Sequence, residues 1–346
     1  MPKLKSFFER EKENKIRCLA CSHYCLIPEE KAGICGVRLN ENGKPKLLLW
    51  DKLTDVYPDR IEKKPFFHFL PGTRALSIGS LGCNFACRFC QNWSRSQTPK
   101  RLEKKQLDQL VSRTTKNYLP QNIVDLAQEL NCPTIAYTYN EPTVFVEYAL
   151  ETMILAKKAG LKNVWVSNGF MSKEVFLAIR KYLDAINIDL KSFSPDFYQR
   201  LCSGRLEPVL ENIKRFWRGG IWVEVTTLVI PEENDSPEEL KKIADFLVEI
   251  SPDIPWHITA FHPDYRMLDK PPTAKGKLVQ AWQIGKKAGL RNVYLGNILN
   301  EERASTFCPQ CGKLLIRRDG YQLAESVGIK KDRCLNCNKR VPGVWS

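Results

Sequence analysis

The feature that most constrains this chain is a run of three closely spaced cysteines, Cys83, Cys87 and Cys90, in GCNFACRFCQNW. The spacing C-x3-C-x2-C supplies three thiolates where a [4Fe–4S] cluster ordinarily takes four. Such a cluster keeps one iron without a protein ligand, and an open iron can hold a substrate. The alternatives are a disulfide, buried structural cysteines or zinc, but structural zinc takes four protein ligands and no fourth lies nearby. The spacing therefore predicts an iron–sulfur enzyme.

The bulk properties favour an intracellular protein. The 346 residues, 43% of them apolar, can bury one large core plus small appended modules. No apolar run approaches the ~18 residues that a membrane span needs, and no secretory signal follows the charged N-terminus. We therefore predict a cytoplasmic location and no membrane partner. Thirteen cysteines in such a chain favour metal binding over disulfides.

The formal net charge of +14 has two interpretations. A basic surface can bind nucleic acid or another anionic partner. It can also be a solvated surface rich in lysine and glutamate, of the kind that hyperthermophile proteins carry. The second interpretation is favoured because no arginine-rich run or aromatic RNA-binding signature accompanies the charge.

Eleven of the thirteen cysteines fall into three groups, and these groups divide the chain. Residues 1–70 form a Cys-rich N-terminal segment, residues 71–300 a core domain with the triplet, and residues 301–346 a C-terminal module. Cys132 and Cys202 stand alone, and we expect both in the core because free cysteines are among the most buried residues.

Short apolar runs alternate with amphipathic stretches through the core domain. Runs of this length, rich in β-branched residues, predict βα units and a parallel sheet, hence an α/β fold. Six or seven units fit a complete or partial (β/α) barrel, and no G-x-G-x-x-G follows the first strand as a Rossmann fold would need. The expected strands are 74–80, 133–139, 163–168, 184–191, 222–230, 256–261 and 291–296. The expected helices include 143–160 and 236–250.

Five motifs follow one another along these strands: CNFACRFC, YNEP, VSNG, DLK and FHP. In this order they resemble the radical S-adenosylmethionine (radical SAM) superfamily, in particular pyruvate formate-lyase activating enzyme and its relatives. CLACSHYCLIPEEKAGICGVR and KKPFFHFLPG are similar to the radical SAM member of the AmmeMemoRadiSam system. The resemblance implies a partial barrel of the radical SAM type and a [4Fe–4S] cluster on the triplet. It also implies S-adenosylmethionine chelated to the open iron, but no particular substrate.

The resemblance further implies cofactor-binding roles after the second and third strands. Asn140 and Glu141 of YNEP fall where radical SAM proteins place a Gly-Gly-Glu-type motif that receives the methionyl ammonium group. A glutamate suits a cationic amine, and the alternative is a carboxylate stabilised at a helix N-terminus. Ser167 and Asn168 of VSNG suit the cofactor's carboxylate and ribose hydroxyls, and the alternative is turn chemistry.

Two further positions complete the predicted cofactor site. Asp189 and Lys191 stand two residues apart at the end of the fourth strand, so their side chains face the same way. They either contact the cofactor or form a buried ion pair. His262, after the sixth strand, is placed to cap the adenine, although a lone histidine is more often structural.

The C-terminal cysteines have the C-x2-C…C-x2-C pattern of a zinc ribbon, with Gly312 easing the turn. We expect zinc on Cys308, Cys311, Cys334 and Cys337, with a rubredoxin-like iron or an unmetallated hairpin as alternatives.

The N-terminal cysteines, Cys18, Cys21, Cys25 and Cys35, leave more than one metal open. A structural zinc, with His23 as a substitute ligand, is favoured because this polar segment needs a staple. An auxiliary iron–sulfur cluster uses the same thiolates. A third alternative is that some of these thiols face the active site. His68 is either part of that site or a packed core histidine.

Together these features predict an enzyme that reductively cleaves S-adenosylmethionine to a 5′-deoxyadenosyl radical, which abstracts hydrogen from an unknown substrate. An electron donor such as ferredoxin or flavodoxin and Memo-like proteins of the AmmeMemoRadiSam system are the expected partners. The alternative enzymes are a glycyl-radical-enzyme activase and an RNA-modifying radical SAM enzyme. A non-catalytic zinc protein that binds nucleic acid is the alternative from another class.

Overall fold

The computed structural model describes residues 6–298 and 302–345, so the predicted domain boundary at residue 300 lies outside the described residues. The chain divides into two compact units. Unit 1 contains residues 1–59, 74–186 and 202–204, and unit 2 contains residues 60–73, 187–201 and 205–346. Within the described ranges, no helix is long and apolar enough to cross a bilayer.

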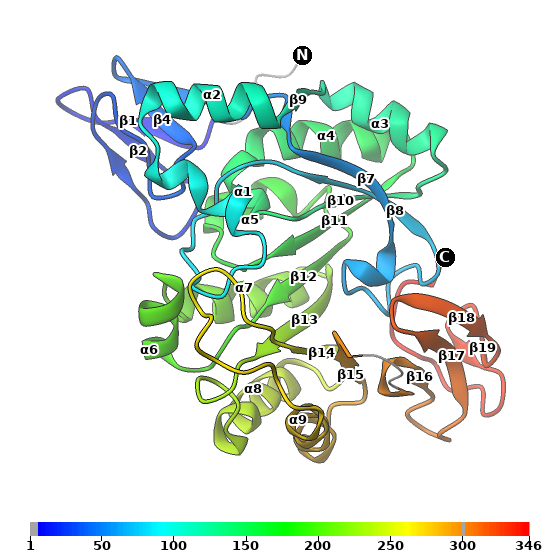
Figure 1. Cartoon of the computed structure of the whole chain (residues 1–346). Helices are drawn as coiled ribbons and strands as arrows, with labels where there is room; N and C mark the ends of the chain where they lie inside the picture. The colour runs from blue at the N-terminus through cyan, green and yellow to red at the C-terminus, as the bar shows by residue number, and fades with distance from the viewer. Residues whose placement is uncertain (1–5, 299–301, 346) are drawn as a thin grey trace. The chain divides into compact units, whose positions relative to one another are not determined.

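Unit 1 is built on parallel strands joined by helices (Figure 1). Strands β8 (Arg74–Gly79), β10 (Thr134–Tyr137) and β11 (Lys162–Ser167) pair in parallel, and β7 (Asp55–Arg60) follows β8 in the strand order. Every residue of β10 is buried, as expected for a strand covered on both faces. The helices of this unit are α1 (Trp93–Ser96), η2 (Thr98–Arg101), α2 (Lys104–Thr114), α3 (Pro120–Glu129), η3 (Pro142–Phe145), α4 (Val146–Lys158) and α5 (Lys173–Ile179).

The N-terminal part of unit 1 consists of very short strands. β1 (Phe8–Arg10), β2 (Ile16–Cys18) and β3 (Leu26–Ile27) form one antiparallel sheet, and β4 (Arg38–Glu41) and β5 (Lys44–Leu47) form another. β6 (Lys52–Leu53) pairs with β9 (Lys116–Asn117). Strands this short bury little surface, so other interactions must hold the segment together.

Unit 2 repeats the parallel arrangement. β13 (Trp222–Val229), β14 (Trp256–Ala260) and β15 (Val293–Gly296) pair in parallel. They alternate with α7 (Glu207–Arg218), α8 (Pro237–Ile250) and α9 (Lys275–Ala288), and the shorter helices are η1 (Ile61–Lys63), α6 (Pro195–Phe197) and η5 (Glu302–Ala304). β12 (Ala185–Asp189) and the π-helix η4 (Tyr198–Cys202) cross the boundary between the units.

A small β-structure ends unit 2 (Figure 1, orange to red). β16 (Thr306–Phe307), β17 (Leu314–Asp319) and β18 (Gln322–Ser326) form one antiparallel sheet, and β19 (Ile329–Lys330) pairs with β20 (Arg333–Cys334). Its Arg318 is buried, donates to the Phe67 carbonyl at 2.8 Å and lies over the Phe67 ring. The C-terminal module therefore packs within unit 2.

All seven predicted strands are present, and local signals explain several element ends. Ser236 caps α8 by accepting from the Glu239 backbone, with Pro237 at the first helical position. α4 ends two residues before Gly160, which has φ +79°. The fourth strand is shorter than predicted, because it ends at Asp189 and leaves Lys191 in the following loop. The α/β fold with mainly parallel strands is thus confirmed, and the closure into a partial barrel stays a prediction.

Candidate functional site

The cysteine triplet lies in the loop between β8 and α1, at the carboxyl end of a parallel strand as predicted. The loop is entered through Gly82, at φ +79°, a conformation that favours glycine. The Phe85 backbone donates to the Cys83 Sγ at 3.4 Å, and the Cys90 Sγ lies 3.2 Å from the Ser96 hydroxyl. Hydrogen bonds to cysteine sulfur tune the potential of a bound cluster.

Asn140 supports the entry to this loop. Its amide oxygen accepts from the Ser80 backbone at 2.9 Å, and its amide nitrogen donates to the carbonyls of Leu81 and Gly82, both at 3.0 Å. Asn140 is buried, and a bond to a cofactor would compete with these three bonds. The structure thus places this predicted cofactor residue as a support for the triplet loop.

Glu141 joins the predicted residues of the second and third strands into one buried network. Its Oε1 accepts from the Thr143 backbone at 3.1 Å, the Thr143 hydroxyl at 2.5 Å and the Ser167 hydroxyl at 2.9 Å. Its Oε2 accepts from the Asn168 backbone at 2.8 Å. Glu141 is therefore the N-terminal cap of η3, which is the helix-terminus role that the sequence left as an alternative. Its Oε2 nevertheless accepts only one of the four bonds. Burial raises the pKa of Glu141 against the effect of these bonds.

Asn168 continues the network to the triplet. Its amide nitrogen donates to the Asn84 Oδ1 at 2.7 Å and lies 3.8 Å from the Cys83 Sγ. The Asn84 Nδ2 is buried and has no hydrogen-bond partner in the described part of the chain. Burial raises the pKa of Cys83.

These features fit the cofactors that the triplet implies. Three cysteines on one loop can ligate three irons of a [4Fe–4S] cluster. Beside Cys83, an unpartnered amide donor and a carboxylate oxygen with an open lone pair complement the carboxylate and ammonium groups of an amino acid. The donors therefore suit a cluster that binds S-adenosylmethionine.

The remaining predicted cofactor residues belong to unit 2. The Lys191 Nζ lies 2.9 Å from the Asp189 Oδ2, with 13% of the lysine and 37% of the aspartate side chain exposed. The ion pair forms with both residues half-buried, and contact with the cofactor stays a prediction. His262 is exposed, and its Nδ1 lies 3.4 Å from the Pro263 carbonyl oxygen.

The C-terminal cysteines come together as two matching turns. The Gly312 backbone donates to the Cys308 carbonyl and the Asn338 backbone to the Cys334 carbonyl, both at 2.9 Å, and Gly312 and Asn338 both have positive φ. The Sγ atoms of Cys308, Cys311, Cys334 and Cys337 all lie within 4.8 Å of one another. A tetrahedral zinc ion with Zn–S bonds of ~2.3 Å needs sulfurs about 3.8 Å apart, so this set fits zinc.

The N-terminal cysteines line one small cavity together with His23, Arg38 and Asn84. Sequence analysis missed the buried ion pair beside them. The Arg38 guanidinium contacts both carboxylate oxygens of Glu147, at 2.7 and 2.6 Å, and its Nε donates to the Cys18 Sγ at 3.2 Å. The sequence did contain a sign of this pair, because Glu147 stands in an otherwise apolar stretch of the predicted helix 143–160 and a buried charge needs a partner.

A second buried polar cluster lies in unit 2. Glu224, near the start of β13, bonds to His257 Nε2 at 2.6 Å and to the backbone N–H groups of Phe67 and His68. Although burial acts in the opposite direction, the bond from His257 keeps the pKa of Glu224 low. His68 is fully buried and bonds to Tyr294, so it is a packed core histidine. The buried Cys132 and Cys202 confirm their predicted core positions.

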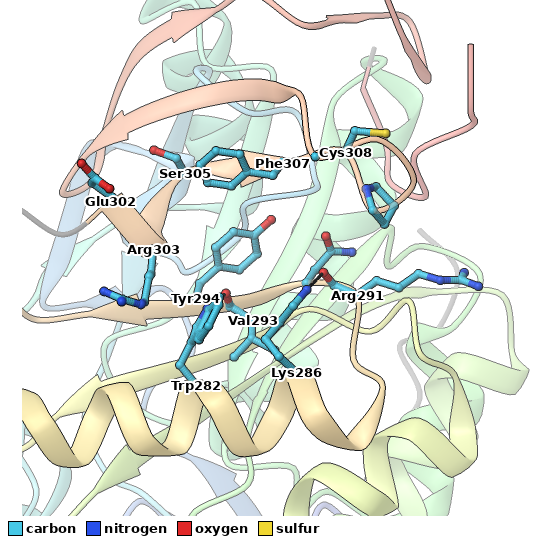
Figure 2. A pocket seen from close by; sticks show the side chains of 13 residues that line it. Trp282, Lys286, Arg291, Val293, Tyr294, Glu302, Arg303, Ser305, Phe307 and Cys308 are labelled. Atoms are coloured by element: carbon cyan, nitrogen blue, oxygen red, sulfur yellow. Dashed lines mark hydrogen bonds between the residues drawn. The ribbon is translucent and has the colours of Figure 1, made fainter. Parts of the chain in front are cut away.

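Unit 2 also has a cavity of about 490 Å³ beside α9 and β15 (Figure 2). Lys286, Arg291, Arg303 and Trp282 line it. Lys286 donates to the Arg291 carbonyl at 2.8 Å, Arg291 pairs with Asp253 at 2.6 Å, and the Arg303 guanidinium lies over the Trp282 ring. These cations serve structural contacts, so the cavity does not by itself indicate a ligand.

The chain is similar in sequence to known proteins. Residues 77–247 match the model of the radical SAM superfamily. The chain is 40% identical over 337 residues to the uncharacterized protein MJ0808 of Methanocaldococcus jannaschii, covering 97% of each chain. It is 23% identical over 188 residues to a pyruvate formate-lyase-activating enzyme of Listeria monocytogenes, covering 51% of this chain and 70% of the enzyme.

A solved structure is similar in fold. The crystal structure of Streptococcus suis SuiB bound to S-adenosylmethionine superposes with a TM-score of 0.50 and 14% sequence identity. The alignment covers 68% of this chain and 53% of SuiB. At this identity the match supports the fold alone.

Proposed function

This chain belongs to the radical SAM superfamily, and on that premise we propose that it is an enzyme that cleaves S-adenosylmethionine reductively. Cys83, Cys87 and Cys90 would hold the cluster. When bound there, a reduced [4Fe–4S] cluster supplies the electron that cleaves S-adenosylmethionine to methionine and a 5′-deoxyadenosyl radical, which abstracts hydrogen from the substrate.

The protein groups position and orient the cofactor. Asn140 holds the backbone on which the triplet begins, and the sulfur-directed N–H of Phe85 stabilises negative charge on Cys83. Glu141 is the acceptor for the ammonium group of the methionyl part of S-adenosylmethionine, and the Asn84 amide is the donor for the carboxylate of the same methionyl part. No residue needs to act as a general base in the cleavage.

The observation that carries this proposal is the pair of open polar groups beside Cys83. Buried polar groups are normally satisfied, and an unpartnered one requires a reason. The Asn84 Nδ2 donor lies in the network that links Glu141 through Asn168 to the first cysteine. An amino acid bound at an adjacent iron supplies the missing partner.

Anaerobic reconstitution tests the proposal. The parent protein, reduced with dithionite, should convert S-adenosylmethionine to 5′-deoxyadenosine and methionine. The Cys83→Ala/Cys87→Ala/Cys90→Ala variant should lose one cluster's iron and sulfide and form no product, whereas Cys132→Ala should behave as the parent. A triple variant that keeps the parent's full iron and sulfide content would refute the proposal.

The N-terminal motif and KKPFFHFLPG support a finer assignment, the radical SAM member of the AmmeMemoRadiSam system. Its partners would then be Memo-like proteins and a low-potential electron donor such as ferredoxin or flavodoxin. Genes for Memo-like proteins beside the gene for this chain would support the assignment. Neighbouring genes for a glycyl-radical enzyme would contradict it.

A glycyl-radical activase is the second candidate, and similarity to pyruvate formate-lyase-activating enzyme favours it. An activase abstracts hydrogen from a backbone glycine of a partner protein. Incubation with a glycine-deuterated partner should then transfer deuterium into 5′-deoxyadenosine. An RNA-modifying enzyme would instead take deuterium from labelled RNA, and a non-catalytic zinc protein would form no 5′-deoxyadenosine with any substrate.

A further inference from the structure

The N-terminal cysteines are gathered around one cavity by a small β-structure. Cys18 ends β2, and Cys21 forms an isolated antiparallel bridge with Met171 in the loop after β11. Cys25 precedes β3, and Cys35 lies in the turn before β4. Cys18, Cys21 and Cys35 are buried, and Cys25 is half-buried. Four thiols lining one enclosed space are a ligand set.

The C-terminal cysteines are grouped for a single ion, and within the described part of the chain the other two cysteine sets are not grouped in this way. The four C-terminal Sγ atoms lie within 4.8 Å of one another, as a single ion requires. Among residues 6–298 and 302–345, neither the N-terminal set nor the triplet forms such a single-ion group. A cubane of four irons holds its cysteine sulfurs roughly 6 Å apart, because each sulfur binds a different iron. The N-terminal set thus lacks the tight single-ion grouping of the C-terminal set, and four thiols around one cavity are compatible with a cluster.

The N-terminal set is also next to the triplet within unit 1. A Cβ added to Gly82, the residue before Cys83, would lie 2.8 Å from the Cys35 carbonyl oxygen. The His23 Nε2 lies 2.9 Å from the carbonyl oxygen of Asn84, the residue after Cys83. Asn84 itself lines the N-terminal cavity. The N-terminal segment that carries the four cysteines is therefore in direct contact with the triplet loop.

We propose that Cys18, Cys21, Cys25 and Cys35 hold a second [4Fe–4S] cluster, ligated at all four irons, that delivers electrons to the triplet. It accepts one electron from a low-potential donor protein, such as a ferredoxin or flavodoxin, and passes one electron to the cluster on the triplet, with no bond formed or broken. Zinc has no redox chemistry and cannot do this. The electron's destination rests on the proposed function, but the identity of the metal does not. Arg38, which donates to the Cys18 Sγ, supplies positive charge beside the thiolates.

Metal analysis of the full chain after anaerobic reconstitution tests the site. The parent should contain about eight irons, about eight sulfides and one zinc. The Cys83→Ala/Cys87→Ala/Cys90→Ala variant should keep about four irons, with an electron paramagnetic resonance signal after reduction that S-adenosylmethionine does not change. The Cys21→Ala/Cys25→Ala variant should also keep about four, with a signal that S-adenosylmethionine does change. Cys132→Ala, which removes a buried thiol outside every set, is the control.

A parent with about four irons and two zinc ions would overturn the inference, and that result does not depend on whether any variant folds. A triplet variant without iron would also overturn it. Failure of the proposed function looks different, because the triplet variant would then keep all of the parent's iron.

The delivery role has its own readout. With reduced flavodoxin as donor, Cys21→Ala/Cys25→Ala should form 5′-deoxyadenosine at least ten-fold more slowly than the parent. With dithionite, a small reductant that does not need the relay, the rate should fall less than three-fold. Equal losses with both donors would show that the second cluster does not deliver the electron.

Discussion

Each unit of this chain buries a glutamate that accepts four hydrogen bonds, and the two glutamates distribute these bonds differently over their oxygens. Glu224 in unit 2 accepts two bonds on each oxygen, from two backbone N–H groups, Trp222 Nε1 and His257 Nε2. Glu141 in unit 1 accepts three bonds on Oε1 and one on Oε2. Each carboxylate oxygen offers two lone pairs, so both oxygens of Glu224 are fully used, whereas three donors share Oε1 of Glu141 and one lone pair of its Oε2 is left.

The two networks also lie at different ends of the strands that carry them. Glu224 and His257 lie near the starts of β13 and β14, while Glu141, Ser167 and Asn168 lie where β10 and β11 end. In parallel α/β folds, ligands bind at the carboxyl ends of strands, and the opposite ends serve stability. We therefore expect a ligand at Glu141, where Oε2 keeps an open lone pair, and a structural role for Glu224.

The largest expected effect concerns the cysteines of unit 2. We expect zinc on the C-terminal set, and Cys311→Ser/Cys337→Ser should remove it completely, because both thiols belong to one closely spaced group that fits a single ion. Iron content and the cluster spectrum should stay at the parent's level. Zinc and iron are measured on the same sample, and an unchanged zinc content would contradict a structural zinc site.

Glu224→Gln should cost about 3–5 kcal/mol of unfolding free energy, the range for breaking a buried charged pair. The new amide NH2 group would face the N–H donors of Phe67 or His68 and leave His257 without its charged partner. Denaturant unfolding measures the loss. S-adenosylmethionine affinity of the folded protein should not change, and a large change would break the comparison.

Lys191→Met should weaken S-adenosylmethionine binding by about 1.5–3 kcal/mol, the range for a charge-assisted hydrogen bond. The methionine keeps the packing of the stem, and Asp189 is 37% exposed, so water can solvate it when the lysine is gone. Cofactor titration and the denaturant midpoint are measured together. A protein that unfolds early yet binds the cofactor as tightly as the parent would show that the pair is only structural.

Glu141→Gln should weaken cofactor binding by a similar or smaller amount, about 1.5–2 kcal/mol, because the amide oxygen still accepts hydrogen bonds but carries no charge for an ammonium group. Unfolding free energy should fall less than in Glu224→Gln, because the four hydrogen-bond donors to Glu141 described above are all neutral groups. If Glu141→Gln is the less stable of the two and binds the cofactor normally, the glutamate is a helix cap alone.

The smallest effect is expected from Gly204→Ala. A Cβ at this position would overlap the Phe85 ring, in the middle of the triplet loop. Overpacking should cost about 1–2 kcal/mol and lower the cluster content after reconstitution. Gly276→Ala in α9 is the matched control, because its Cβ would meet no atom within 4 Å in the described structure. Equal iron contents in the two variants would show that the loop tolerates the shift.

Much of the fold followed from local pattern. The apolar runs at 133–139 and 222–230 became β10 and β13, because a parallel strand buried on both faces needs side chains of that kind throughout. The triplet's place after β8 followed from the same pattern. Lys191 was misplaced by the strand prediction, because pattern alone does not fix where a strand ends.

The sequence by itself determined the chemistry of the ligand sets, because three thiolates at C-x3-C-x2-C and two C-x2-C pairs restrict the metals that can bind. Tertiary structure decided which groups support them. Arg38 pairs with Glu147, Asn140 holds the triplet loop, and the four C-terminal sulfurs come within 4.8 Å of one another. These facts depend on distances between residues far apart in the chain, which spacing along the sequence does not encode.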